Sequence, residues 1–357
     1  MTVVILIASL LIILFGAIVF ANGVEWLGTR LKLGHSAVGS VLAAVGTAMP
    51  ESLIPLVAIF FSKNGHLSDD IGIGAILGAP FMLSTLVFFL CGVSAIIFAK
   101  RRRILSASSA GTAFTPAVNT PGPTLTVNVS VMRRDLGFFL AVYSVAFLAA
   151  FIHIMTVRYV IAIVLALSYV VYVTYTLRQG RAEFNKGEDE GEDQTPPLYL
   201  ARNNPNPPTA LVLLQVAIGL VLIVVGARIF VDATQSIAIA MGVPALILAL
   251  LIAPITTELP ETFNSFFWIS RGKDTLALGN ICGAMIIQSS ILPAMGIAFT
   301  AWNLTPAALV SCLLAIISSA IILFQASTKG SLKPVTLITG GIFYLAFLFM
   351  VFTGVIK

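Results

Sequence analysis

Two short stretches place carboxylates where the chain otherwise reads as membrane-spanning helix. GTAMPES (46–52) contains Glu51, and TTELPET (256–262) contains Glu261. A charged side chain at the centre of a bilayer costs roughly 2.5 kcal/mol or more, so each carboxylate needs a partner ion or a proton. No Lys or Arg lies in the middle of any predicted helix. The sequence therefore indicates a site for mobile cations or protons.

The prolines of both stretches free backbone oxygens for the same chemistry. A proline cannot donate a hydrogen bond to the carbonyl four residues earlier. Pro50 should therefore free the carbonyl oxygen of Gly46, and Pro260 that of Thr256, and we expect both helices to be kinked. Free carbonyls beside carboxylates are the oxygen ligands that hard cations prefer.

The hydroxyl groups of each stretch share a helix face with its carboxylate. Thr47 precedes Glu51 by four residues and Thr257 precedes Glu261 by four, a spacing that brings side chains together on a helix. Glu258 lies three residues before Glu261 and should share its face. These residues predict two clusters of oxygen ligands.

The elements that must hold these residues are apolar runs of about 20 residues. With 58% hydrophobic and 10% charged residues, the chain has the composition of an all-α, multi-pass membrane protein. Ten runs are each long enough to cross roughly 30 Å of hydrocarbon. They are 3–28, 36–61, 70–99, 136–155, 158–177, 209–230, 243–269, 275–299, 305–325 and 334–355.

The chain divides into two five-helix halves, 1–177 and 209–357, separated by a cytoplasmic linker at 178–208. The two acidic motifs are related by an offset of 210 residues, from Glu51 to Glu261. The next helices also correspond, as GIGAILGAPFMLS (72–84) and ALGNICGAMIIQS (277–289). These align Gly74 with Gly279 and Gly78 with Gly283, positions that we expect to allow close helix packing. Because each half has an odd number of helices, the second copy enters from the opposite side, which predicts an inverted repeat.

The basic residues predict the orientation. Sixteen of the 20 Lys and Arg residues lie in the connections after predicted helices 1, 3, 5, 7 and 9. Basic loops face the cytoplasm, so both termini are predicted to be extracytoplasmic in the cell membrane. The net charge of +5 is explained by this bias, and no nucleic-acid partner is expected. The acidic run in the linker is interpreted as a solvated spacer, with a cytoplasmic calcium sensor as the alternative.

The paired motifs resemble the alpha repeats of the cation/calcium exchanger superfamily, at about 36–90 and 243–295. The resemblance rests on the "G-T-x-x-P-E"-like motif in each half and on the small-residue helix that follows it. It implies that Glu51 and Glu261 are the central ion ligands, that Thr47 and Thr257 contribute oxygens, and that Asn280 fills the "G-N" position of the eighth helix.

This chain departs from the superfamily pattern at several positions. Ala48 and Glu258 stand where Ser is common, and Pro80 and Met285 stand where Asn or Asp is common. The third helix therefore supplies few oxygens, and the ligands should be concentrated in helices 7 and 8. Gln288 and Ser289 are candidate replacements there, although polar side chains such as these and Asn280 also join helices by hydrogen bonds.

These features favour a secondary active antiporter over an enzyme or a channel. The chain has no H-E-x-x-H, G-x-G-D or G-x-S-x-G motif, so an intramembrane hydrolase is not supported. An inverted repeat with an acidic helix in each half suits alternating access better than a continuous pore. We expect calcium exchange for sodium, with proton-coupled exchange as the alternative. Small cations and the bilayer are the expected partners, no resident cofactor is expected, and the oligomeric state is left open.

Overall fold

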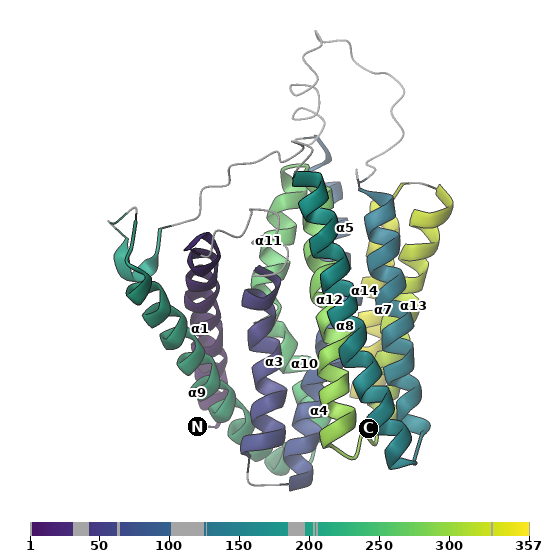
Figure 1. Ribbon diagram of the computed structural model, residues 1–357. Coiled ribbons are helices and arrows are strands. Elements are labelled where there is room, and N and C mark those ends of the chain that lie inside the picture. Colours follow the sequence, from purple (N-terminus) through teal and green to yellow (C-terminus); the bar gives the residue numbers. More distant parts are fainter. Residues whose placement is uncertain are drawn as a thin grey trace. The chain divides into compact units, whose positions relative to one another are not determined.

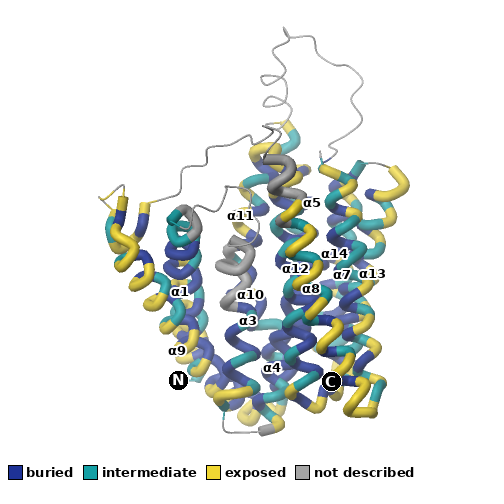
Figure 2. Tube along the Cα trace, in the orientation of Figure 1, coloured by how far each residue is buried: buried dark blue, intermediate teal, exposed yellow. Residues whose placement is uncertain are grey.

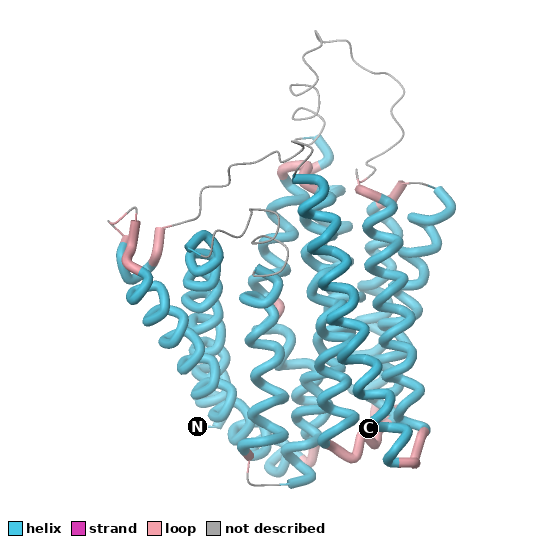
Figure 3. Tube along the Cα trace, viewed as in Figure 1, coloured by secondary structure: helices cyan, strands magenta, loops and turns pink. Residues whose placement is uncertain are grey.

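The computed structural model describes residues 2–30, 43–62, 65–100, 125, 127–184, 197–202, 204, 206–329 and 331–356. Figure 3 shows that helices make up most of these residues. The described residues contain no β-strand, only an isolated bridge between Leu125 and Leu332. The all-α class predicted from the apolar runs is confirmed.

Most predicted spans appear as helices close to the expected positions. By length and composition, eight helices of the described residues can cross a membrane, and the interrupted pair α10–α11 makes a ninth. The predicted span 36–61 is described only from residue 43 onward. The main helices are α1 Thr2–Arg30, α3 Ala43–Phe61, α4 Gly65–Met82, α5 Phe88–Ile97, α7 Val129–Leu148, α8 Met155–Phe184, α9 Thr209–Met241, α10 Ala245–Thr257, α11 Leu259–Ser270, α12 Asp274–Phe299, α13 Pro306–Lys329 and α14 Pro334–Phe352.

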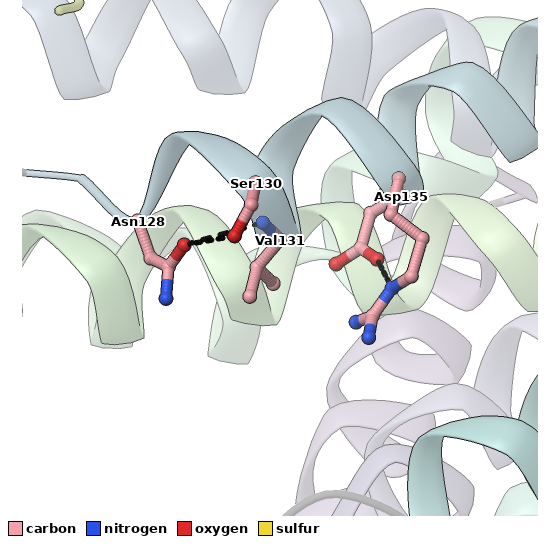
Figure 4. A network of polar contacts seen from close by, with 5 residues as sticks. Asn128, Ser130, Val131 and Asp135 are labelled. Carbon is pink, nitrogen blue, oxygen red and sulfur yellow. Dashed lines mark hydrogen bonds and ion pairs between the residues drawn. The ribbon is translucent and has the colours of Figure 1, made fainter. Parts of the chain in front are cut away.

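The start of α7 corrects the predicted boundary at residue 136. The helix begins at Val129 because Asn128 caps it, with the Asn128 side-chain oxygen accepting a hydrogen bond from the Val131 amide at 3.3 Å. Within these charged first turns, Arg134 donates to the buried Asp135 carboxylate at 2.7 Å (Figure 4). Hydropathy alone excluded these charged residues from the helix.

Helix α9 is also longer than predicted, since it continues from residue 230 to Met241. It ends at Gly242, whose φ of 64° is a left-handed conformation that glycine adopts without strain. Arg228 and Asp232 are exposed within this helix. The polar pair thus interrupts the hydropathy signal without ending the helix.

The third span contains a π-helical turn, η2, at Leu83–Val87 between α4 and α5. Pro80 precedes this turn inside α4 and cannot donate a backbone hydrogen bond. The Ser84 carbonyl at the turn accepts a hydrogen bond from the Ser318 hydroxyl of α13 at 2.5 Å. The wider turn is therefore held by a neighbouring helix.

The described residues form two compact units, and each unit draws on both sequence halves. The first unit contains residues 1–76, 152–257 and 290–302. The second contains residues 77–151, 258–289 and 303–357. The division into sequence halves thus follows the repeat, whereas the division into compact units follows the packing of the helices.

Helices α1 and α9 lie side by side in the first unit (Figure 1). Their backbones approach at glycines, because a Cβ atom at Gly16 would lie 2.9 Å from Leu222 Cβ and one at Gly219 would lie 2.7 Å from Phe20. Small residues permit this kind of contact between membrane helices. A buried apolar core joins this pair to α3, α4 and α10.

In the second unit, α14 packs on α5 and α13 packs on α7. Phe81 lies in the interior, with its ring 4.8 Å from Phe347 and 5.5 Å from Tyr344. The buried residues (dark blue in Figure 2) lie along the helix faces that meet one another. In contrast, most apolar side chains of α8 in the first unit are exposed, as a lipid-facing helix requires.

Candidate cation site

The TTELPET stretch contains a helix interruption at Glu258. Helix α10 ends at Thr257 and α11 begins at Leu259, with Pro260 in its first turn. The Glu258 carbonyl accepts hydrogen bonds from the Thr262 amide at 2.9 Å and from the Thr262 hydroxyl at 2.6 Å. The interruption predicted for this helix from Pro260 is therefore present, and it places Glu258 at the N-cap of α11.

Two carboxylates meet at this interruption within the second unit. Glu258 and Glu261 are almost completely buried, with 0% and 1% of their surfaces exposed. One carboxylate oxygen of Glu258 lies within 4.8 Å of one carboxylate oxygen of Glu261. The sequence from residue 243 to residue 270 contains no Lys or Arg that could neutralise them. Two buried like charges at this distance favour a bound cation or proton.

Gln288 of α12 contacts the first of these carboxylates. Its side-chain Nε2 donates a hydrogen bond to Glu258 Oε1 at 2.6 Å, and both side chains are fully buried. The remaining oxygens, Glu258 Oε2 and Gln288 Oε1, accept no hydrogen bond from the residues that the structure describes. Both atoms are ligands that a hard cation could use.

Asn280 and Ser289 lie on the same helix as Gln288 but make different contacts. Asn280 is half-buried and directs its side-chain nitrogen to the Ser265 hydroxyl oxygen at 3.5 Å. The buried Ser289 hydroxyl donates to the Ile286 carbonyl of its own helix at 3.1 Å. Neither residue is hydrogen-bonded to Glu258 among the contacts described.

Ser265 is a polar residue of this region that the sequence analysis did not single out. Its side chain is fully buried, and its hydroxyl donates to the Ala277 carbonyl of α12 at 3.2 Å. Ser265 follows Glu261 by four residues, so helix periodicity alone could have placed it on the same face. The Ser265 hydroxyl thus connects α11 to α12 by hydrogen bonds, on the face of α12 that carries Asn280.

The remaining predicted ligands lie in the first unit. Glu51 of α3 is buried with 3% exposure, and Thr256 and Thr257 at the end of α10 are buried as well. The Thr257 hydroxyl donates to the Ala253 carbonyl of its own helix at 3.2 Å. Gly46 and Thr47 belong to the helical backbone of α3, but their side-chain environment lies outside the described residues. Helix α3 continues through Pro50 and Pro55 as one element, without the interruption seen at Glu258.

The aligned glycines behave differently in the two halves. A Cβ atom at Gly74 would lie 2.3 Å from the Leu246 carbonyl oxygen, so this glycine is a close-packing position as predicted. In contrast, no atom of the described residues lies within 4 Å of a Cβ built at Gly279 or Gly283. Among the described residues, these two glycines therefore do not have the packing role predicted for them.

The sequence profile described as "Sodium/calcium exchanger protein" matches residues 1–178 and 211–354. An uncharacterized membrane protein of Methanocaldococcus jannaschii is 26% identical over 291 residues, which are 82% of this chain and 80% of that protein.

Two solved structures share the fold. The H⁺/Ca²⁺ exchanger CAX has a TM-score of 0.72 at 13% identity, covering 98% of this chain and 82% of that one. The sodium-calcium exchanger NCX_Mj has a TM-score of 0.55 at 20% identity, covering 97% of both chains. At these identities the similarity establishes the helical arrangement.

Proposed function

The chain belongs to the sodium/calcium exchanger family, whose members are membrane transporters rather than enzymes, and from this premise we propose that it exchanges calcium for sodium by alternating access. The family assignment supports a cation/calcium antiporter in general. The ligand atoms support calcium and sodium as the exchanged pair.

The observation that carries the proposal is the pair of buried carboxylates at the interruption between α10 and α11. Glu258 and Glu261 provide two buried carboxylates within 4.8 Å of each other, on helices whose sequence from 243 to 270 contains no basic residue. A divalent cation neutralises both charges at once. Calcium also tolerates irregular arrangements of oxygen ligands, which suits a site built around a broken helix.

We assign the residues the following roles. Glu261 and its counterpart Glu51 of the first repeat bind the transported cation through their carboxylates, and Glu258 adds a further carboxylate oxygen. Thr47 and Thr257, together with the backbone carbonyls of Gly46 and Thr256, are proposed to supply neutral oxygens. Asn280 and Ser289 are weaker candidates, because the contacts described for them lie elsewhere.

Alternating access is supported by the repeat. The first repeat has α1, α3, α4–α5, α7 and α8, and the second has α9, α10–α11, α12, α13 and α14 in the same order. Such repeats with opposite orientation let one arrangement of helices open to either side of the membrane. We further propose that the protein lies in the cell membrane with both termini outside, as the distribution of basic residues indicates.

The test is cation flux in proteoliposomes containing the purified protein. Vesicles loaded with sodium and diluted into sodium-free buffer should accumulate calcium, and vesicles without a sodium gradient should not. A pH gradient of matched size tests the proton-coupled alternative. Calcium uptake driven only by the pH gradient would show that protons, and not sodium, are exchanged for calcium. No calcium uptake under either gradient would refute the proposed exchange.

A further inference from the structure

The side chains of Glu258 and Gln288 form a hydrogen bond between two helices of the second repeat. The two residues lie 30 positions apart, Glu258 at the N-cap of α11 and Gln288 inside α12, and their side chains meet at 2.6 Å. Both side chains have 0% exposure. A hydrogen bond to a buried charged group fixes that group more firmly than a contact in water does.

The first repeat lacks both members of this pair. Subtracting the motif offset of 210 from position 258 gives Ala48, and subtracting the following-helix offset of 205 from position 288 gives Leu83. The carboxylate and the amide are therefore present together in one repeat and absent together from the other. This pattern is expected if the function of the Gln288 amide is to donate a hydrogen bond to the Glu258 carboxylate.

The hydrogen bond also limits how Glu258 can bind a cation. Its Oε1 atom is engaged by the Gln288 amide, so its Oε2 atom remains to bind an ion from one side. Gln288 Oε1 is the second buried oxygen without a hydrogen-bond donor among the described residues. The pair thus offers two oxygens in a fixed arrangement, one charged and one neutral. Calcium requires more oxygens and more negative charge than sodium does.

We propose that Gln288 is the positioning residue that gives the site its preference for calcium over sodium. The inference rests on the proposed function, because it assumes that Glu258 contacts the transported cation. Gln288 holds the Glu258 carboxylate in a binding-ready orientation, so calcium does not have to reorganise a buried charged side chain when it binds. Sodium, with half the charge, depends less on that carboxylate.

The experiment measures equilibrium binding of calcium and of sodium to the purified protein in detergent, together with the calcium dependence of flux. Gln288→Leu keeps the approximate volume and removes the amide. We expect its Kd for calcium to rise roughly tenfold, as for the loss of one charged hydrogen bond. Its Kd for sodium should change much less.

A swap variant separates positioning from general structural damage. Glu258→Gln alone removes the carboxylate, whereas Glu258→Gln combined with Gln288→Glu restores one carboxylate and one amide with their positions exchanged. The double variant should recover calcium binding relative to Glu258→Gln. Ser311→Ala is the matched control, because it deletes a buried hydroxyl that donates to the Ala308 carbonyl of its own helix and makes no described contact with Glu258 or Gln288.

The outcomes distinguish the inference from the proposed function. If the wild-type protein neither binds nor transports calcium, the proposed function fails and the inference fails with it. If the wild-type protein does both, but Gln288→Leu changes the calcium and sodium Kd values equally or not at all, only the inference is overturned. The inference is also overturned if the swap variant is folded, as judged by thermal unfolding and gel filtration, but binds calcium no more tightly than Glu258→Gln.

Discussion

Gln215 of α9 donates a hydrogen bond to the Asn22 side-chain oxygen of α1 at 2.8 Å, and the same two residues hold the end of the linker. Gln215 Oε1 accepts from the Leu200 amide at 3.0 Å, and Asn22 Oδ1 accepts from the Tyr199 amide at 3.2 Å. Gln215 and Leu198 are fully buried. The last part of the predicted linker 178–208 therefore docks on the α1/α9 pair.

Gln215→Leu should therefore release residues 197–201 from these helices. The substitution removes the acceptor for the Leu200 amide and leaves that amide without its partner, which costs roughly 1–3 kcal/mol if the segment stays docked. We expect faster amide hydrogen exchange at Tyr199 and Leu200. Gln325→Leu is the control, since Gln325 accepts from the Lys333 amide and does not contact the linker among the described contacts. Unchanged exchange in Gln215→Leu would show that apolar contacts alone dock the segment.

Removing the charge of a proposed cation ligand should strongly reduce exchange without unfolding the protein. Glu51→Gln and Glu261→Gln each keep the side-chain volume and remove a buried carboxylate. The loss of one charged partner in a buried site predicts a fall in calcium flux of roughly tenfold or more. Flux in proteoliposomes is the measurement, with gel filtration to verify folding. Wild-type flux in either variant would remove that residue from the proposed ligands.

The two aligned glycines provide a matched pair of substitutions. Gly74→Ala places a methyl group 2.3 Å from the Leu246 carbonyl oxygen, so α4 and α10 must separate. We expect a loss of about 1–3 kcal/mol in stability, measured as a lower unfolding temperature. Gly279→Ala meets no described atom within 4 Å and should be neutral or slightly stabilising in a helix. Equal destabilisation by the two substitutions would contradict this packing difference.

The predicted orientation can be tested with introduced cysteines. Asn204 is exposed in the connection before α9, and Val355 is 70% exposed after α14. Cysteine at position 355 should react with an impermeant thiol reagent in intact cells, and cysteine at position 204 should react only after permeabilisation. The native Cys91, Cys282 and Cys312 are buried and should give little background. The opposite labelling pattern would place both termini in the cytoplasm.

Much of the helical architecture follows from the sequence alone, because hydropathy over about 20 residues is a local property. The apolar runs predict the positions of nearly all the described helices, and Pro260 predicts the interruption in the seventh span. The repeat of Glu51 as Glu261 identifies the acidic positions without any structure. Helix ends were less certain: charged residues obscured the start of α7, although its Asn128 cap could be read locally.

Tertiary structure decided which polar groups meet. The sequence offered Asn280, Gln288 and Ser289 as equivalent candidates on one helix, and helix packing brought only Gln288 into hydrogen-bond contact with Glu258 in the described contacts. The same applies to Gly74 and Gly279, which are alike in the repeat, although among the described residues only Gly74 has a neighbouring backbone in close contact. Such contacts join residues distant along the chain, and they depend on helix rotation and side-chain orientation, which sequence periodicity does not specify.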